Sequence, residues 1–352
     1  MRHYIIPIFI PHLGCPHTCV FCSQRRITGV QTNVGPAEIE QLLEFHLGQI
    51  DRPYFVEAAF YGGSFTALPH DLQRRLLAPA ARCFADGRLQ AIRISTRPDC
   101  IDDAVLALLW QAGVRTIELG AQSFDDDVLR QAERGHTAAD IRAAAAQIRA
   151  AGFALGIQLM PGLPGDTPAA MQYSLQETLH IQPDIARIYP TIVIAGTRLA
   201  ELYTGGRYKP LALADAVEIA AHMKLALERK GIRVIRTGLQ SGGELDQPGT
   251  VLAGPYHPAF GEMVESWYFG RMAEQLLARY GTIRGTVVLH HAPADASKLR
   301  GVHRSNVLHW QSLYPEAQFN FCADGGRDAI STEFAGLCYT IDKTLLMDGV
   351  RE

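Results

Sequence analysis

Three cysteines lie within eight residues of one another near the start of the chain, in the segment GCPHTCVFC at residues 14–22. Cys15, Cys19 and Cys22 have the spacing C-x3-C-x2-C, and the glycine, proline and threonine beside them indicate a loop. Because iron–sulfur clusters are bound by cysteine thiolates, this spacing indicates one metal centre. A 4Fe–4S cluster bound by three cysteines keeps one iron open to another molecule. A structural zinc site is the alternative, and it needs a fourth ligand such as His12 or His17.

Glycines and polar residues follow the apolar segments that we predict as strands. Gly62, Gly63 and Ser64 come directly after residues 55–61, and the two glycines leave backbone amides and carbonyls open to a ligand. Arg134 precedes an alanine-rich segment, and its guanidinium can bind a carboxylate at two points. Because the strands of a (β/α) barrel end at one rim, such residues gather in one site. The other residues at predicted strand ends are Ser95, Gln122, Ser123, Gln158 and Met160.

Strand-like and helix-like segments alternate over the first 240 residues. Repeated strand–helix units imply a parallel sheet, so the fold class is α/β. The architecture is either a full or partial (β/α) barrel or an open doubly wound sheet. Asp71 and Asp102 are good N-cap residues for two of the helices. The predicted strands are 4–10, 55–61, 89–95, 115–119, 153–159, 185–189 and 232–235, and the predicted helices are 36–47, 71–84, 102–112, 138–151 and 213–230.

A smaller C-terminal α/β domain follows residues 241–249, which we interpret as a linker because they are rich in glycine and polar residues. We expect the first domain to span residues 1–240 and the second to span residues 250–352. The elements predicted in the second domain are helices at 258–280 and 302–313 and strands at 285–290, 318–321 and 339–341.

The cysteine motif after a first strand resembles the radical S-adenosylmethionine (SAM) superfamily. Further segments are similar to the radical SAM domain of the Elongator catalytic subunit, elongator protein 3. They are STRPD, ELGAQSFDDDVLRQAERGHT, AGFALGIQLMPGLPGDT and ARIYPTIVIAGTRLAELYTGGRYKP. The similarity covers residues 5–240, and a more distant one extends to oxygen-independent coproporphyrinogen oxidase. It implies a partial (β/α)6 TIM-like barrel whose open edge is covered by the C-terminal domain.

The resemblance also implies an activity, two cofactors and the residues that bind them. In this superfamily one electron from a 4Fe–4S cluster cleaves SAM to methionine and a 5′-deoxyadenosyl radical, which removes a hydrogen atom from the substrate. Three cysteines bind the cluster, here Cys15, Cys19 and Cys22. Phe21 is then expected near the adenine, and Arg134 beside the SAM carboxylate. The other implied SAM contacts are Gly62, Gly63, Ser64, Ser95, Gln122, Ser123, Gln158 and Met160.

Several departures limit what carries over from Elongator, whose enzyme modifies the wobble uridine of tRNA. The first cysteine gap is shorter here, and Ser64 stands where the commonest form of the superfamily has an acid. We find no coenzyme A loop after residue 240, so we expect no acetyltransferase domain. The expected substrate is tRNA or another RNA, with a small metabolite or peptide as the alternative. The implied electron donor is a low-potential flavodoxin or ferredoxin. A non-catalytic protein that binds a cluster, SAM or RNA is a rival from another class.

Residues 271–310 carry a local positive charge, from six basic and two acidic residues. Trp267 and Trp310 lie near its edges, and basic residues beside aromatic ones can bind phosphates and stack on bases. A solvated helix face with buried aromatic side chains is the alternative. His290 and His291 end a predicted strand, where we expect them to contact substrate, with a pair of core histidines as the alternative.

The composition is that of a globular protein, with 47% hydrophobic and 20% charged residues. The net charge of −3 gives no overall sign of nucleic-acid or membrane binding. We expect a cytoplasmic protein without a membrane span, because no apolar run reaches 18 residues and residues 1–11 lack a signal-cleavage site. Of the four remaining cysteines, Cys83 falls in a helix pattern and Cys100 lacks C-x2-C spacing, whereas Cys322 and Cys338 are candidates to meet in space.

Overall fold

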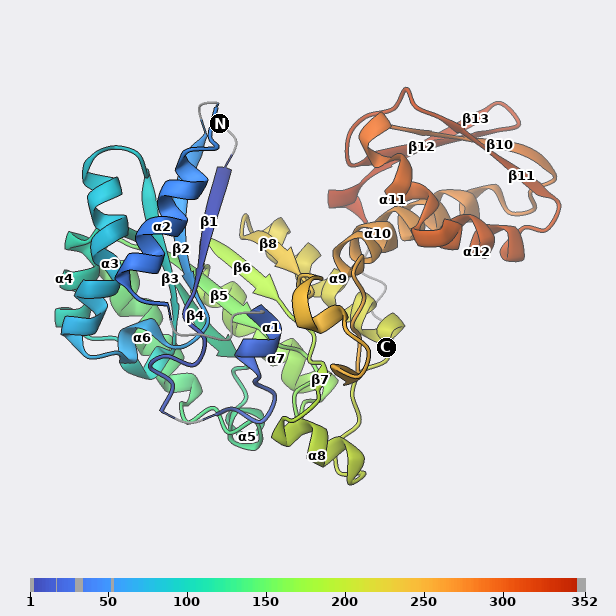
Figure 1. The fold of residues 1–352 in the computed structure, drawn as a ribbon. Helices are drawn as coiled ribbons and strands as arrows, with labels where there is room; N and C mark the ends of the chain where they lie inside the picture. The colour runs from blue at the N-terminus through green and yellow to red at the C-terminus, as the bar shows by residue number, and fades with distance from the viewer. Residues whose placement is uncertain (1–2, 17, 29–33, 52–53, 347–352) are drawn as a thin grey trace.

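Seven parallel strands form one curled sheet in a computed structural model that describes residues 3–16, 18–28, 34–51 and 54–346 (Figure 1). The strands follow one another in sequence order, whereas a doubly wound sheet reverses its order at a switch point. The sheet is a half-barrel, which confirms the partial TIM-like barrel, and its edges are β1 and β8. Its strands are β1 (His3–Phe9), β2 (Phe55–Tyr61), β3 (Ala91–Thr96), β4 (Val114–Gln122), β5 (Ala154–Leu159), β6 (Ile185–Ile188) and β8 (Arg233–Thr237).

Helices cover the outer face of the half-barrel, and capping residues set where several of them begin (Figure 1). Asp102 caps α4 by accepting a hydrogen bond from the Val105 amide at 2.8 Å, as expected. Asp71 instead lies in the first turn of α3, whose N-cap is Pro69. None of the described helices is both long and apolar enough to span a bilayer. The helices of this part are α1 (Gln24–Thr28), α2 (Pro36–Leu47), α3 (His70–Ala85), α4 (Asp103–Gln111), α5 (Asp126–Gln131), α6 (Ala138–Ala150), α7 (Pro168–Ile181), α8 (Arg198–Thr204) and α9 (Leu213–Arg229).

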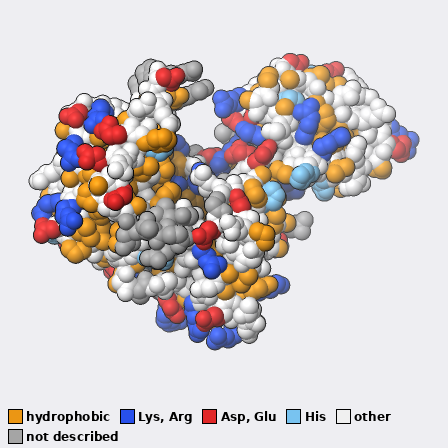
Figure 2. All heavy atoms as spheres, in the orientation of Figure 1, with side chains coloured by type: hydrophobic (Ala, Val, Ile, Leu, Met, Phe, Trp, Pro, Cys, Tyr) orange, Lys and Arg blue, Asp and Glu red, His pale blue; other side chains and the backbone are white. Residues whose placement is uncertain are grey.

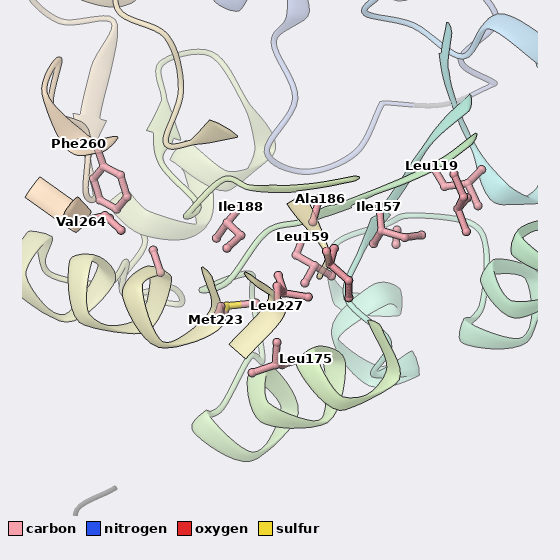
Figure 3. Packing of buried hydrophobic residues seen from close by; sticks show 14 of the residues in the cluster. Leu119, Ile157, Leu159, Leu175, Ala186, Ile188, Met223, Leu227, Phe260 and Val264 are labelled. Atoms are coloured by element: carbon pink, nitrogen blue, oxygen red, sulfur yellow. The ribbon is translucent and has the colours of Figure 1, made fainter. Parts of the chain in front are cut away.

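One continuous apolar core joins the half-barrel to the C-terminal part of the chain. Strands buried on both faces read as nearly unbroken apolar runs, which is why the sequence showed them clearly. Figure 3 shows Ile188 of the sheet above Met223 of α9, with Ile157 further along the same sheet. Phe260 and Val264 of α10 (Phe260–Leu277) extend the same core. Helix α10 therefore anchors the C-terminal sheet beside β8.

The C-terminal sheet has four strands in the order β11-β10-β12-β13. Cys322 lies on one edge strand and Cys338 on the other, three strand spacings or roughly 14 Å apart. These two cysteines therefore do not meet in space. Strand β12 was not predicted from the sequence. The elements of this part are β10 (Gly285–His291), α11 (Ala296–Arg300), α12 (Ser305–Leu313), β11 (Ala317–Cys322), β12 (Ala329–Phe334) and β13 (Leu337–Asp342).

The predicted linker at residues 241–249 is not an extended connection. It forms a short 3-10 helix (Gly243–Asp246) that packs beside α1. Leu245 in this turn is 2% exposed and packs in an apolar cluster with Ile192 and Ile194. The chain then pairs β9 (Val251–Ala253) with β7 (Val193–Ile194) before α10 begins. The division into domains at 1–240 and 250–352 stays a prediction.

A chain of four buried charges crosses the interior of the half-barrel. Arg93 of β3 donates to Glu57 of β2 at 2.6 Å and to Glu118 of β4 at 2.8 Å. Arg187 of β6 donates to Glu118 at 2.6 Å. This last contact passes over β5 at Gly156, where an added Cβ would lie 2.8 Å from the Glu118 Cγ. The two carboxylates balance the two guanidiniums, so the interior of the half-barrel holds compensated charges.

Substitution of Glu118 tests this compensation. Burial alone would raise the pKa of Glu118, but Arg187 and Arg93 hold it below its ordinary value of 4.5. Glu118→Gln should lower the free energy of unfolding by about 3 kcal/mol at neutral pH, because two buried guanidiniums are left with one carboxylate. Urea unfolding followed by circular dichroism measures the change.

The same experiment has a pH dependence and a matched control. Because the folded-state pKa is lowered, the stability that Glu118 contributes is present above about pH 4.5 and is lost as the pH falls through that lower pKa. The wild-type and variant proteins should therefore converge in acid. Glu262→Gln, at an exposed carboxylate on α10, should change the free energy by less than about 0.5 kcal/mol. Equal losses in the two variants would contradict the prediction.

Candidate functional site

The cysteine loop follows β1 and lies directly against the turn after β2. The Cys15 Sγ is 3.7 Å from the Ser64 Oγ. An added Cβ at Gly14 would lie 2.2 Å from the Ser64 carbonyl oxygen, and one at Gly63 would lie 2.3 Å from the Leu13 carbonyl oxygen. Both glycines also have a positive φ, +74° and +68°. The two segments therefore touch backbone to backbone, and glycine is needed on each side.

A glutamine side chain that no sequence motif points to links the same two segments. The Oε1 of Gln24 accepts hydrogen bonds from the Gly63 amide at 2.6 Å and from the His12 amide. The backbone amide of Gln24 donates a hydrogen bond to the His12 Nε2 at 3.2 Å. Gln24, the first residue of α1, therefore fixes the cysteine loop to the Gly-Gly turn.

The donor set fits a cluster in which each thiolate binds its own iron. Among the described residues, no three His, Cys, Asp or Glu side chains converge as ligands of a single metal ion, and a cubane cluster needs no such convergence. The Nε2 of His12, one zinc candidate, already accepts from Gln24. His17, the other candidate, lies outside the described residues.

Burial shapes the acidity of the thiols. Burial, followed by the neighbouring Cys19 and Cys15, raises the pKa of the Cys22 thiol to about 12. Burial also raises the pKa of Cys15, although the hydrogen bond with Ser64 opposes this. Metal binding requires thiolates, so a bound cluster would replace these protons with positive charge. Closely spaced buried thiols of this kind suit a cationic metal centre.

Arg134 reaches from the end of α5 to the cysteine loop. It is 7% exposed, and its Nη1 donates to the Cys19 Sγ at 2.9 Å. Its Nη2 donates to the Gly120 carbonyl at 2.7 Å, and the guanidinium lies 5.9 Å from the centre of the Phe21 ring. The structure thus brings together the arginine, the aromatic ring and the cysteine that the sequence predicted as one site.

A cavity of about 1060 Å³ runs from the cysteine loop into the half-barrel. Ser123 lies outside its lining, because its hydroxyl is 3.1 Å from that of Ser174 on α7 and also accepts from the Asp125 amide. The predicted site residues that line the cavity are Cys15, Cys19, Phe21, Cys22, Gly62, Gly63, Ser64, Ser95, Gln122, Arg134, Gln158 and Met160.

The described lining comes wholly from residues 3–242. The C-terminal sheet contributes none of it, because its attachment through α10 holds it beyond α9 (Figure 1). Helix α10 itself packs against the edge strand β8.

The side chains of Gln122 and Gln158 are hydrogen-bonded to each other at the rim of the half-barrel. The Nε2 of Gln158 donates to the Oε1 of Gln122 at 3.0 Å, and the Met160 amide donates to the Gln122 carbonyl at 2.8 Å. Gln122 has a φ of +70°, a conformation that costs a non-glycine residue about 1–3 kcal/mol. Such strain is common where a chain is held to present a side chain to a ligand.

The charged floor of the cavity was not among the predicted site residues. Arg93, Glu118 and Arg187 line it together with Tyr61 and Tyr189. A signal was present, since Glu57, Arg93, Glu118 and Arg187 interrupt apolar runs in four predicted strands, and their signs alternate along the chain.

The basic C-terminal region buries two of its large aromatic side chains. Trp310 and Tyr268 are fully buried, as the alternative of buried aromatic side chains implies, whereas Trp267 is half-buried and has the Arg271 guanidinium 6.0 Å from the centre of its ring. Arg271 and Lys298 each pair with a carboxylate three residues away, at 2.7 and 2.9 Å. Figure 2 shows acidic and basic side chains interspersed on the face of the C-terminal lobe in view.

The two C-terminal histidines have structural partners. His291 is 1% exposed, and its Nδ1 lies 2.8 Å from the Ala292 carbonyl, so the expected substrate contact is wrong for this residue. The Nδ1 of His290 lies 2.8 Å from a carboxylate oxygen of Asp324.

Curated relatives match about half of this chain. The tRNA uridine(34) acetyltransferase of Methanocaldococcus jannaschii is 32% identical over 184 residues, which cover 51% of this chain and 33% of the relative. Human Elongator complex protein 3 is 31% identical over 201 residues, covering 51% of this chain and 37% of the relative. The chain therefore spans about a third of the length of the curated relatives it matches.

Solved structures and family models agree with the fold. The archaeal Elp3 of Methanocaldococcus infernus has a TM-score of 0.62 over 78% of this chain and 63% of that chain, at 23% identity. The Radical SAM superfamily model matches residues 9–177, and the Radical_SAM C-terminal domain model matches residues 183–268. Together the two matches span the cysteine loop and strands β2 through β8. This chain therefore belongs to the radical SAM superfamily, whose enzymes use a 4Fe–4S cluster and SAM.

Proposed function

We propose that this radical SAM enzyme modifies an RNA, with tRNA as the first candidate, and that Cys15, Cys19 and Cys22 hold its cluster. The observation that carries the cluster assignment is the placement of all three cysteines on one loop at the cavity. When bound, the cluster supplies one electron that cleaves SAM to methionine and a 5′-deoxyadenosyl radical, which takes a hydrogen atom from the substrate. The chain's own residues bind, orient and shield these molecules.

The SAM site that we propose combines exposed backbone with one buried cation. Gly62 and Gly63 offer backbone groups to the methionine amino end, and Arg134 is the guanidinium for the carboxylate. Ser64 brings a neutral hydroxyl to this turn, so the backbone provides most of the binding there. The other proposed contacts are Phe21, Ser95, Gln122, Gln158 and Met160. Ser123 is left out because its hydroxyl is bonded to Ser174.

The RNA substrate is supported by the relatives rather than by the C-terminal surface. Proteins named tRNA uridine(34) acetyltransferase match half of this chain. Because the match covers about a third of those relatives, their full reaction does not carry over. The reductant that a radical SAM enzyme needs is proposed to be a low-potential flavodoxin or ferredoxin. A small metabolite or peptide substrate is the competing outcome of the tests below.

Removal of one cluster ligand should abolish the chemistry. Cys15→Ala, Cys19→Ala or Cys22→Ala should each lower the iron content from about four per chain after anaerobic reconstitution and abolish 5′-deoxyadenosine formation with dithionite. Iron assay and mass spectrometry measure the two effects. Cys338→Ala, at an exposed cysteine of β13, is the matched control and should behave as the wild type. Full SAM cleavage by any of the three ligand variants would sink the assignment.

Gly63→Ala should weaken SAM binding by forcing apart the two backbone segments. An added Cβ there would lie 2.3 Å from the Leu13 carbonyl oxygen. We expect SAM affinity, measured by equilibrium dialysis, to fall at least about tenfold. Gly206→Ala is a matched control, because Gly206 has a φ of +69° but an added Cβ there meets nothing within 4 Å. Both variants carry a backbone penalty of about 1–2 kcal/mol, so equal SAM affinity in the two would refute the role of the close contact.

A tRNA pool tests the proposed substrate class. With SAM and dithionite present, unfractionated tRNA should increase 5′-deoxyadenosine formation and yield a nucleoside of altered mass after nuclease digestion. The Cys19→Ala protein should yield neither change. If the wild-type enzyme forms 5′-deoxyadenosine but leaves every nucleoside unaltered, the substrate is a small metabolite or peptide instead.

A further inference from the structure

Two arginines on the open edge of the half-barrel face the cavity. Arg233 and Arg236 of β8, the edge arginines, are three residues apart and line it together with the two residues between them. In a regular strand such residues point to opposite faces. Here the register shifts between Ala186 and Arg187, so that Arg236 lies opposite Arg187 and Ile235 is an extra residue. This bulge turns Arg236 to the same face as Arg233.

The edge arginines bring positive charge that the surrounding residues do not balance. Arg187 is already matched by Glu118 within the chain of two acids and two bases. In the described part of the chain, no hydrogen bond or ion pair joins the side chain of Arg233 or Arg236 to another residue. Like charges directly opposite one another on neighbouring strands are destabilising. An anion between the strands would relieve this repulsion.

Two tyrosine hydroxyls add neutral donors at the same place. Arg187 donates through its Nη2 to the Tyr61 hydroxyl at 2.9 Å and through its Nη1 to the Tyr189 hydroxyl at 3.0 Å. Because these oxygens accept from Arg187, their own hydrogens are directed elsewhere. Burial raises the pKa of Tyr61 to about 12 and also raises that of Tyr189, so both hydroxyls keep their hydrogens at neutral pH. We call these two residues the cavity tyrosines.

We propose that the edge arginines and the cavity tyrosines bind a phosphate group of the substrate on the β8 side of the cavity. A phosphate carries the negative charge and the several acceptor oxygens that this set of donors requires. The cavity of about 1060 Å³ is at the upper end of the range for one small ligand, about 300–1,000 Å³, so it has room for SAM near the cysteines and a substrate group near β8. The inference rests on the proposed function in taking this cavity as the substrate site.

Calorimetric titration of the cluster-loaded protein with SAM present tests the proposal. The probes are uridine, uridine 5′-monophosphate and inorganic phosphate. Uridine 5′-monophosphate should bind at least about tenfold more tightly than uridine, and inorganic phosphate should compete with it. Arg236→Gln and Arg233→Gln should each weaken the monophosphate about tenfold and leave uridine unaffected. Equal affinity of the wild-type protein for uridine and its monophosphate would overturn the proposal.

Matched variants exclude an effect of folding. Arg149→Gln, at an exposed arginine on the outer helix α6, should not change phosphate binding. Arg236→Lys, which keeps the charge, should retain most of it. Arg236→Gln should unfold at a Tm no lower than that of the wild type, because it removes a like-charge pair. Phosphate should raise the wild-type Tm more than that of the variant. A phosphate-induced Tm rise equal in both proteins would contradict the assignment.

Binding to unfractionated tRNA identifies the source of the phosphate. If the group belongs to an RNA backbone, each glutamine substitution should lower the slope of log affinity against log salt by about one. An effect on the monophosphate without an effect on tRNA would support the phosphate site and assign it to a small substrate. Failure of the wild-type enzyme to form 5′-deoxyadenosine would count against the proposed function, whereas the phosphate comparison would still stand.

Discussion

A Cβ atom at Gly14 or Gly63 would lie within 2.3 Å of a carbonyl oxygen on the opposite segment. The cysteine loop and the turn after β2 therefore meet where side chains have no room. Gln24 then bonds to both sides of the contact. Because the loop cannot slide along this turn, the three thiols and the open backbone of Gly62 stay at fixed positions relative to each other. The other residues of the site surround these two groups.

The interior of the half-barrel is subject to a different constraint, the electrostatic balance of its charged side chains. Glu57, Arg93, Glu118 and Arg187 come from four strands and remain buried only because their charges balance. Gly156 on β5 leaves the space through which Glu118 and Arg187 meet. These four side chains make the floor polar, but they are bonded to one another and not available to a ligand. The edge arginines, in contrast, add positive charge that no described neighbour balances.

Strand order made much of the site predictable. Parallel strands deliver their ends to one rim, so Ser95 and Gln158, far apart in the sequence, were expected together and both line the cavity. Ser123 was predicted at the same strand end as Gln122. Adjacent side chains along a strand point to opposite faces, and the Ser123 hydroxyl contacts Ser174 of α7 instead.

The other features that the sequence did not predict depend mainly on tertiary packing. Leu245 buried the supposed linker through contacts with residues some fifty positions away, which local composition does not reveal. The position of the C-terminal sheet follows from apolar surfaces on α9 and α10, and no spacing in the sequence encodes that match. Gln24 also escaped notice, because one amide after a loop has no distinctive pattern.

The bulge at Ile235 means that the way β8 pairs with β6, and not residue type alone, determines the charge of the cavity wall. If β8 paired with β6 without the bulge, Ile235 would lie opposite Arg187 and Arg236 would point to the outer face. Half-barrels with the same residues but a different pairing of this strand would thus present different charges to their substrates. The substrate specificity of such a half-barrel can therefore change without any new side chain, when the side chains of its edge strand switch faces.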